Sequence, residues 1–408
     1  MFRRTFSCFV LSAFLAGGAF SGSISISDNP VGYAKISANA KKSVTVTNRQ
    51  ELLNALKKGG VIFVQGDIDM TDGMLPSEAG GSTAALDSFV SKNSSFKTYE
   101  EYKKAYAADC TFSTNDKSSS KIESSVGKTT WKLSASYSNL ISLKVKSNTT
   151  IIGLEGATIR GGSLKIRGVS NVAIRNLTIL DAYDPFPHHE DDDGFNAEHD
   201  AIVIDSSSDI WIDHCTVGDT MKYQKVVIKD GNEEKWQTYD GLCDIKNGAK
   251  NVVVSYCVFQ NHDKTILIGS SNKDTAGGRI SIHHNRFINC GQRLPLTTYP
   301  EMHIFNNSYE RTADAFYKQQ ACIAARYGAY SIIAENNNFG EGVEKTIIAS
   351  TKAAGKCYES GNIFTSGKPT LETQSTKPFS PSYQYSLDDA TEIPNILKSQ
   401  AGVGSVSK

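Results

Sequence analysis

The chain lacks any apolar run long enough to cross a membrane. Beyond its N-terminus, no stretch of the 408 residues approaches the ~20 apolar residues that a spanning helix needs. The N-terminus combines Arg3 and Arg4 with a short apolar run over 8–20 and small residues after it. This pattern predicts a secretory signal peptide over residues 1–22. We therefore expect an extracellular protein whose mature part, 23–408, is secreted and contacts no membrane.

A net charge of either sign is also missing. The 43 basic residues are balanced by 43 acidic residues, so no global field favours nucleic acid or an anionic surface. A charged ligand must therefore be bound by a local group of side chains. We expect a monomer with no nucleic-acid partner.

Closely spaced cysteines are absent too. No CxxC pair occurs, which excludes the usual structural zinc sites. Seven of the eight cysteines remain after removal of the signal peptide, so at least one is unpaired. Cys215 and Cys257 are expected to be small buried thiols. No Ser-His-Asp or phosphate-loop pattern stands in a suitable context.

What the chain does contain is a repeat. The segment N-V-A-I-R-N-L-T-I recurs in modified form, and its copies start 38, 42, 28, 22 and 30 residues apart. The shortest step is too brief for a βαβ unit, which needs about 30 residues, but it suits one coil of a parallel β-solenoid. The copies begin at Asn171, Asp209, Asn251, Arg279, Glu301 and Ser331.

Equivalent positions of the repeat carry matching polar residues. Asn285, Asn307 and Asn337 share one position, and Cys215 and Cys257 occupy it in earlier copies. Successive coils rise by ~4.8 Å, so stacked asparagines can satisfy one another's amides in a turn that excludes water. Coincidental Asn-rich loops would not share this register.

The remaining segments flank the repeat. Asn48 can cap a helix over 49–58 that covers an open edge of the sheet. Residues 71–135 are predicted to be an elaborated loop with one helix over 98–107, and 365–408 a tail packed on the solenoid that ends in a short helix. We expect an all-β parallel β-helix with an N-terminal capping helix and peripheral loops, forming a single domain.

Acidic residues precede the short apolar runs of successive coils. These are Glu198, Asp200, Asp240 and Asp244, and on a solenoid the runs are neighbouring rungs of one sheet. A lone loop aspartate is normally just solvated, but four acids at one edge favour a metal. Because they offer only hard oxygen ligands, they select Ca²⁺ over zinc or copper.

Two cations occupy the same register. Lys264 and Arg293 precede the next two apolar runs, so the polar edge spans about three rungs, ~14 Å at ~4.8 Å each. An exposed ion pair is the simpler interpretation. A groove with a metal and two cations instead suits a polyuronate. His214, His283 and His284 fall at a turn on the opposite side and are expected to be structural.

These motifs together resemble the extracellular pectate lyases of polysaccharide lyase family 1. The resemblance implies a right-handed parallel β-helix and β-elimination in polygalacturonate, the (1→4)-α-D-galacturonan, which leaves oligosaccharides with a 4,5-unsaturated non-reducing end. The match covers most of the chain. The motifs are S-N-T-T-I-I-G from Ser147, D-G-F-N-A-E-H-D from Asp193, W-I-D-H from Trp211, D-G-L-C-D-I-K from Asp240, H-D-K-T-I-L-I-G-S from His262, R-L-P-L from Arg293 and H-I-F-N-N from His303.

The resemblance also implies a metal site. Asp200, Asp240 and Asp244 would bind Ca²⁺, and Glu198 stands at a further acidic position suited to a second, substrate-linked Ca²⁺. The metal would draw charge from the substrate carboxylate and stabilise the carbanion formed at C5.

The same resemblance implies roles for the cations. Arg293 would take the C5 proton, and Lys264 would bind the substrate carboxylate. Guanidinium groups almost never lose their proton, so an optimum well above neutral pH is expected. Thr298 stands where the family usually has a second arginine, and Arg326, one coil further on, could replace it in substrate binding.

Other functions stay open at this point. A pectin lyase acting on methyl-esterified pectin would need no Ca²⁺, and the acids at Asp200, Asp240 and Asp244 argue against it. A non-catalytic wall-binding β-helix would be marked by loss of Arg293 or Lys264, yet both are present. A hydrolase on the same fold would give a saturated product.

Overall fold

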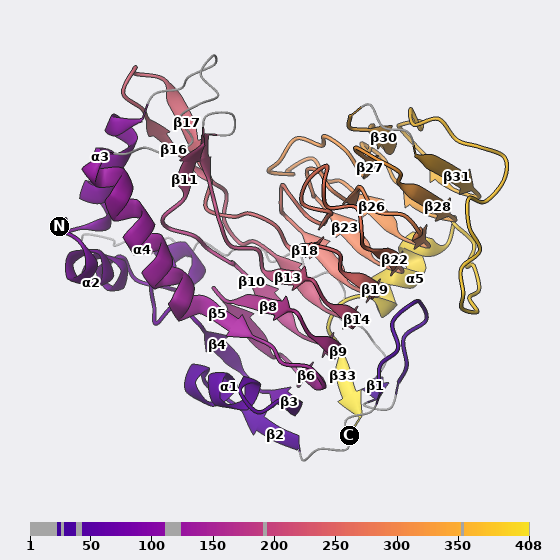
Figure 1. Ribbon diagram of the computed structural model, residues 1–408, viewed down its shortest axis with the longest axis horizontal. Coiled ribbons are helices and arrows are strands. Elements are labelled where there is room, and N and C mark those ends of the chain that lie inside the picture. The colour runs from indigo at the N-terminus through magenta and orange to yellow at the C-terminus, as the bar shows by residue number, and fades with distance from the viewer. Residues whose placement is uncertain are drawn as a thin grey trace, which may run out of the picture.

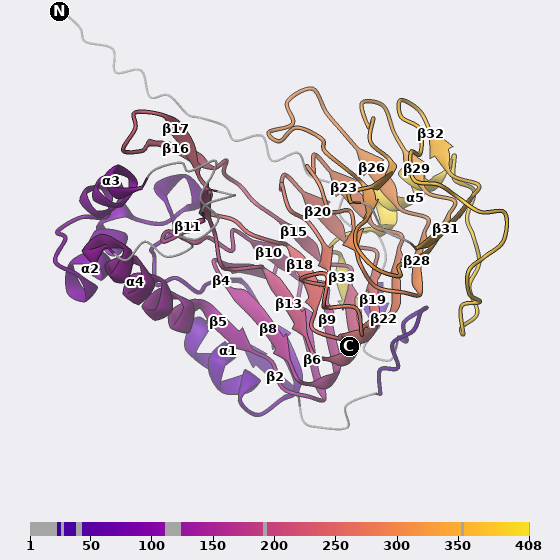
Figure 2. The same cartoon turned by 45° about the horizontal axis from the view of Figure 1, so that its top comes forward.

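The computed structural model describes residues 23–25, 28–37, 43–110, 124–190, 194–351 and 355–407. Three long parallel sheets of ten, nine and eight strands wind around one axis, and the colour in Figures 1 and 2 advances from indigo to yellow along the stack. The predicted all-β parallel β-helix is confirmed. The predicted signal peptide, 1–22, lies outside the described residues.

The predicted repeats form the ten-stranded sheet, in which every neighbouring pair is parallel. The shared register of the copies follows from this pairing, because equivalent residues of successive copies are Cα partners. The strands in spatial order are β2 (Ser43–Val46), β3 (Gly60–Val64), β6 (Thr149–Gly153), β9 (Ser170–Arg175), β14 (Ser208–Asp213), β19 (Lys250–Ser255), β22 (Gly278–His283), β25 (Met302–Phe305), β28 (Ser331–Glu335) and β31 (Lys356–Ser360).

The nine-stranded sheet carries the end of each copy. It consists of β4 (Asp67–Asp69), β7 (Thr158–Arg160), β10 (Thr178–Leu180), β15 (Thr216–Gly218), β20 (Val258–Gln260), β23 (Arg286–Ile288), β26 (Ser308–Glu310), β29 (Asn338–Phe339) and β32 (Ile363–Phe364).

The eight-stranded sheet carries the predicted site. Its strands are β5 (Ser142–Lys144), β8 (Ser163–Arg167), β13 (Ile202–Asp205), β18 (Cys243–Lys246), β21 (Leu267–Ile268), β24 (Leu296–Thr297), β27 (Ile323–Ala325) and β30 (Ile347–Ala349).

The interior is a column of like residues stacked on like. Phe259, Phe287, Tyr309 and Phe339 lie face to face with ring centroids 5.3, 5.1 and 4.5 Å apart along the nine-stranded sheet. Each ring is fully or almost fully buried. Parallel in-register rungs force this stacking, and the burial of large aromatic surface is a main source of stability.

The predicted polar ladder lies at the turn after the ten-stranded sheet. The Oδ1 of Asn307 accepts a hydrogen bond from the backbone N of Asn285 at 3.0 Å, and Asn307 N donates to Asn337 Oδ1 at 3.0 Å. Cys257 N donates to Asn285 at the other end, at 2.9 Å, and Asn362 continues the ladder beyond Asn337. The predicted register of these residues is confirmed.

The residue before each ladder position adopts a left-handed conformation. His284, Asn306 and Asn336 have φ of 56°, 51° and 48°. Asparagine tolerates this region better than most residues, which explains why asparagine pairs recur at these turns.

The predicted capping helix is present as α1 (Arg49–Leu56), and the side chain of Asn48 accepts a hydrogen bond from Glu51 N at 3.0 Å. Its buried residues Leu52 and Leu56 join the main core. The helix therefore covers the first coil, where β2 forms the edge of the sheet.

Residues 71–135 contain more helix than predicted. The expected helix is α3 (Tyr99–Asp109), but α2 (Thr83–Asn93) and most of α4 (Ser125–Ile141) also fall in or overlap this segment. The composition of α4, rich in Ser and Thr, has low helix propensity, and tertiary packing overrides it. Figure 1 shows the three helices beside the first coils.

These helices share a second core with a small four-stranded sheet. Tyr102, Tyr137, Phe186 and Trp236 are buried there. The sheet consists of β11 (His188–Glu190), β12 (Gly194–Asn196), β17 (Glu233–Trp236) and β16 (Gln224–Val227). This four-stranded sheet, which we call the arm, is formed by the two longest insertions between repeats.

The C-terminal tail contacts the solenoid through its helix. It contains α5 (Ile393–Gln400), whose residues Ile393 and Leu397 are buried against Val258. A final strand, β33 (Ser405–Ser407), pairs with β1 (Ser23–Ser25) near the start of the chain.

Two further observations concern the described part of the chain. None of its helices has the length and apolar character needed to span a membrane. Its seven cysteines are all free and buried, which confirms the prediction for Cys215 and Cys257.

Candidate functional site

The predicted site residues lie on adjacent rungs of the eight-stranded sheet. Lys264 forms parallel bridges with Gly241 on one side and Gln292 on the other. Ala201 N donates to Gly241 O at 2.9 Å. These contacts bring Asp200, Asp240 and Arg293 to one edge, each beside or within the bridged row. The structure thus places Asp200, Asp240, Lys264 and Arg293 along one edge of the sheet.

Two of the carboxylates are buried and share a lysine. The Nζ of Lys246 donates to Asp200 Oδ2 at 3.0 Å and lies 3.7 Å from Asp244 Oδ2. The remaining oxygens accept backbone hydrogen bonds, Asp200 from Gly241 N at 3.0 Å and Asp244 from Leu267 N at 3.1 Å. Each carboxylate is therefore fixed by the strand beside it.

The three aspartates strongly affect one another's protonation. Burial raises the pKa of Asp240 well above its ordinary value, and the Asp200 carboxylate raises it further. Burial and Asp200 also raise the pKa of Asp244, to about 6. The cluster consequently has room for additional positive charge.

The donor set fits a calcium ion in its chemistry. In the described part of the chain, no three His, Cys, Asp or Glu side chains stand close enough to hold a metal as they are oriented here. The Oδ1 atoms of Asp244 and Asp200 nevertheless converge on Gly241, where an added Cβ would lie 2.5 and 2.8 Å from them. Convergent carboxylate oxygens around a residue without a side chain suit Ca²⁺.

Glu198 points away from this convergence. Its Oε1 lies 3.2 Å from Nδ1 of His188, which lowers the Glu198 pKa through that hydrogen bond. Glu198 also lines a cavity beside α4. Its partner here is therefore a histidine, and its metal-binding role stays a prediction.

Lys264 is held from two sides. Its Nζ donates to Asn196 Oδ1 at 2.6 Å and lies 3.7 Å from Asp240 Oδ1. Asn196 belongs to β12 in the arm, so the arm fixes the orientation of the lysine. His262 supports the same region, with Nε2 2.7 Å from Asp240 O and Nδ1 2.5 Å from Asp219 Oδ2.

Arg293 has an unusual backbone and a partly unpaired head group. Its φ is 60°, a conformation uncommon for residues other than glycine and one that recurs at functional sites. Its Nε is buried and has no hydrogen-bond partner among the described residues. The guanidinium therefore keeps a donor for a ligand.

Arg326 directly follows β27, one coil beyond Arg293. Burial lowers the pKa of Arg326, and the charge of Arg293 lowers it further. One of its nitrogens, Nη2, donates to Gly269 O at 2.8 Å. Thr298 is fully buried and donates to Asp274 O at 2.9 Å, so this position contributes nothing to the groove.

The histidines set aside on sequence grounds lie elsewhere. His283 ends β22 in the ten-stranded sheet, and its Nε2 donates to Val31 O at 2.8 Å. His284 contacts Asp388 in the C-terminal tail at 2.9 Å. Both hold chain segments against the outer surface.

Sequence reasoning missed several residues of the site. Lys246 stands two residues after Asp244, and the period of two in a strand places both on one face, so that signal was present. Asn196 and Asp219 come from long insertions outside the repeat register, and no spacing rule could place them.

Comparisons with known proteins identify the family of this chain. A family model described as pectate lyase matches residues 76–406. Pectate lyase E of Dickeya chrysanthemi is 34% identical over 284 residues, covering 65% of this chain and 73% of that protein. The solved pectate lyase from Acidovorax avenae subsp citrulli superposes with a TM-score of 0.80 at 25% identity, covering 97% of this chain and 98% of that one.

A second solved structure, described as a pectate lyase bound to hexasaccharide, gives a TM-score of 0.69 at 26% identity and covers 91% of this chain and 93% of that one. The family match spans more than half of the chain and the folds coincide over nearly all of it. This chain therefore belongs to the pectate lyase family and is a polysaccharide lyase folded as a right-handed parallel β-helix.

Proposed function

We propose that this lyase is Ca²⁺-dependent and cleaves polygalacturonate by β-elimination, leaving oligosaccharides with a 4,5-unsaturated non-reducing end. The observation that carries the proposal is one polar edge on which buried aspartates, Lys264 and Arg293 occupy adjacent rungs. The similar pectate lyase that carries a hexasaccharide supports an oligosaccharide substrate.

Asp200, Asp240 and Asp244 would hold the metal. Bound Ca²⁺ supplies positive charge that withdraws electron density from the substrate carboxylate and stabilises charge developing at C5. Lys246 balances two of these carboxylates here. Glu198, which stands apart beside the cavity, would serve a second Ca²⁺ shared with the substrate.

Lys264 and Arg293 act directly on the sugar in this proposal. Lys264, oriented by Asn196, binds the C6 carboxylate and favours the charge that develops on it. Arg293 in its neutral form accepts the proton from C5, the electron pair forms the C4–C5 double bond, and the C4–O bond breaks. The leaving oxygen takes a proton from water, and the hydroxide that remains takes the proton back from Arg293. Arg326 contributes a second guanidinium to substrate binding.

Three broader expectations accompany this function as proposals. The mature protein would be residues 23–408, forming a single domain with the 71–135 segment and the 365–408 tail as peripheral parts. It would be secreted after removal of residues 1–22, and it would act as a monomer.

Product analysis tests the reaction type. Mass spectrometry of oligosaccharides released from polygalacturonate should show products lighter by one water than those of hydrolysis. Saturated products would contradict elimination and indicate a hydrolase. Products formed only from methyl-esterified pectin would indicate a pectin lyase, and their absence from both substrates would favour a binding protein.

A further inference from the structure

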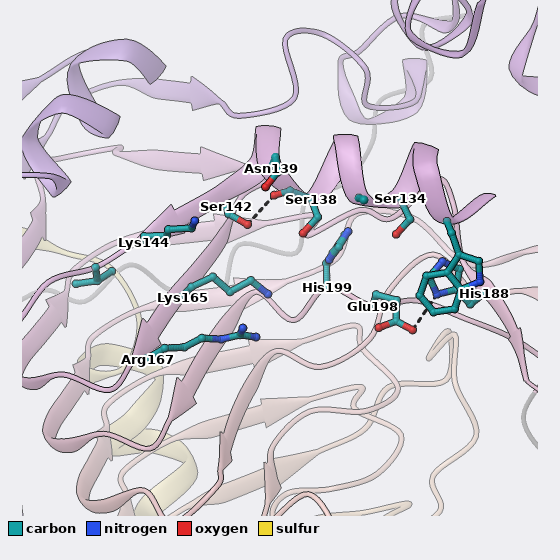
Figure 3. A pocket seen from close by; sticks show the side chains of 13 residues that line it. Ser134, Ser138, Asn139, Ser142, Lys144, Lys165, Arg167, His188, Glu198 and His199 are labelled. Atoms are coloured by element: carbon teal, nitrogen blue, oxygen red, sulfur yellow. Dashed lines mark hydrogen bonds and ion pairs between the residues drawn. The ribbon is translucent and has the colours of Figure 1, made fainter. Parts of the chain in front are cut away.

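A cavity of about 520 Å³ lies beside the polar edge, between α4 and the first strands of the eight-stranded sheet. Figure 3 shows Lys165 and Arg167 extending along it in the direction of His199 and Glu198. Of the residues proposed for metal binding and elimination, only Glu198 is among those that line this cavity.

The cavity continues the row of residues that contains the aspartates. Lys144 and Lys165 are Cα partners on β5 and β8, and Lys165 pairs through Val203 with Asp244. Their neighbours Leu143 and Leu164 are fully buried in the core, so alternation along the strands turns both lysines outward. The cavity therefore begins two rungs before Asp244, along the direction in which a bound polymer would run.

Positive charge predominates among the residues that line this cavity. Neither Lys144 nor Lys165 makes a hydrogen bond or ion pair with the residues that the structure describes, although the charge of Lys165 also acts on Asp200. Arg167 lies 3.7 Å from Asp205 and is 57% exposed. Glu198 is the one carboxylate among the lining residues. Three cations facing one carboxylate favour an anionic ligand.

An aromatic side chain stands at the same cavity. Trp131 of α4 is 51% exposed, the largest exposed aromatic surface among the described residues. Its ring lies over His188 with centroids 3.8 Å apart, so the indole is supported from behind. A held, exposed indole offers an apolar face to the C–H face of a sugar ring.

We propose that this cavity is a distal subsite for an unesterified uronate residue of the polymer, with Lys144, Lys165 and Arg167 binding carboxylates and Trp131 stacking on a sugar ring. The inference rests on the proposed function and deepens it, because it makes substrate preference depend on chain length and on free carboxylates away from the bond that breaks. Lys144 and Lys165 stand one rung apart, ~4.8 Å, and Arg167 follows two residues after Lys165 on β8. This extended group of cations with an aromatic wall suits an acidic sugar polymer better than a compact anion.

Kinetics on long and short substrates test this subsite. The variants are Lys144→Ser, Lys165→Met and Trp131→Ala, with Lys250→Ser as a matched control because Lys250 is an exposed lysine on the ten-stranded sheet. Each cavity variant should raise KM for polygalacturonate by about five- to tenfold, as the loss of one charge-assisted or stacking contact implies. The kcat should change less than about twofold, and KM for trigalacturonate should rise less than KM for the polymer.

Affinity electrophoresis in gels containing polygalacturonate gives a readout that needs no turnover. The wild-type protein and Lys250→Ser should be retarded equally and the cavity variants less, while gels containing the neutral, carboxyl-reduced polymer should retard none of them. Cavity variants that match the wild type in both KM and retardation would overturn the subsite.

The two proposals can fail separately. A wild-type protein that binds the polymer through these residues yet releases no unsaturated product would contradict the elimination and retain the subsite. A wild-type protein that eliminates normally, with cavity variants that do likewise on long and short chains, would retain the elimination and contradict the subsite. Equal retardation by the neutral polymer would contradict recognition of carboxylates.

Discussion

Two rows of polar side chains run along this solenoid at the same rung spacing, and they treat their hydrogen-bonding groups differently. In the turn ladder, Asn307 donates to Asn337 Oδ1 and to the backbone oxygens Ile282 O and Phe305 O, and it accepts from Asn285. At the groove, Arg293 and Arg326 keep buried Nε atoms that have no partner among the described residues. In the turn ladder, the repeated asparagines satisfy one another's hydrogen-bonding groups. In the groove row, some hydrogen-bond donors remain unpaired within the described part of the chain.

The difference teaches where function can reside in a stacked fold. A row of identical amides can complete itself because each residue both donates and accepts. A row that mixes carboxylates with guanidinium and ammonium groups does not repeat one side chain, because the insertions that add Asn196 and Glu198 interrupt the repeat. Its hydrogen-bonding groups are therefore not all paired within the row. In the proposed function, the unpaired groups of this row bind a metal and an acidic polymer.

The largest effect is expected from Arg293→Ala, which removes the proposed base from the groove row. Elimination should slow by about 10³-fold, as expected for loss of a general base. The midpoint of thermal unfolding should stay within about 2 °C, because Arg293 makes few contacts that the fold needs. A variant that retains more than a tenth of the wild-type kcat would contradict the role.

A substitution in the turn ladder should reduce stability rather than activity. Asn307→Ala leaves the buried N of Asn285 without its acceptor at 3.0 Å, so the free energy of unfolding in urea should fall by about 2–4 kcal/mol. Activity of the folded fraction should persist. Asn54→Ala, at an exposed position of α1, is the matched control and should change the free energy of unfolding by less than about 0.5 kcal/mol. Equal stability of both variants would contradict the ladder.

The buried His283, next to this ladder, should make the stability of the fold depend on pH. Burial, together with the charge of neighbouring His284, lowers the pKa of His283 to about 3, and Val31 O and Asp213 oppose this shift in part. The unfolded imidazole binds a proton near its ordinary pKa of about 6.5. Between these values the unfolded chain binds more protons than the folded chain, so stability should be full above pH 6.5 and fall as the pH drops toward 3.

His283→Gln isolates this contribution, since the amide can still donate to Val31 O but does not titrate. Urea unfolding at pH 7 and pH 4 should show a loss of stability that is smaller in the variant by on the order of 2 kcal/mol. An equal loss in the wild type and in the variant would assign the acid sensitivity to other groups.

The smallest effect is expected from Arg326→Ala, which tests whether a residue one coil further on replaces the arginine absent at position 298. KM for polygalacturonate should rise by about tenfold, the equivalent of one charge-assisted contact, with kcat nearly unchanged. Arg279→Ala, at an exposed position of β22, should leave KM as it is. An unchanged KM in Arg326→Ala would remove Arg326 from the groove.

Much of the fold could be predicted because each coil of a solenoid repeats the same sequence pattern. The repeat from Asn171 and the shared position of Asn285, Asn307 and Asn337 fix the pairing of the strands. The helices α2 and α4 could not be predicted, because their packing on the arm, through residues such as Tyr137 and Phe186, outweighs weak local propensity.

For the candidate site, the repeat predicts the positions of residues along the sheet but not the orientation of their side chains. Asp200, Asp240, Lys264 and Arg293 precede apolar runs in register, so their alignment follows from the spacing. Orientation does not follow from spacing. Glu198 turns to His188 in the arm, a contact between two insertions that no periodicity encodes.

The most direct test of the central claim is the ultraviolet absorbance of unsaturated product formed from polygalacturonate, measured with added Ca²⁺ and with EDTA. The absorbance should rise with Ca²⁺, vanish with EDTA and return when Ca²⁺ is restored in excess. A signal that ignores EDTA and is stronger on methyl-esterified pectin would contradict a calcium-dependent pectate lyase.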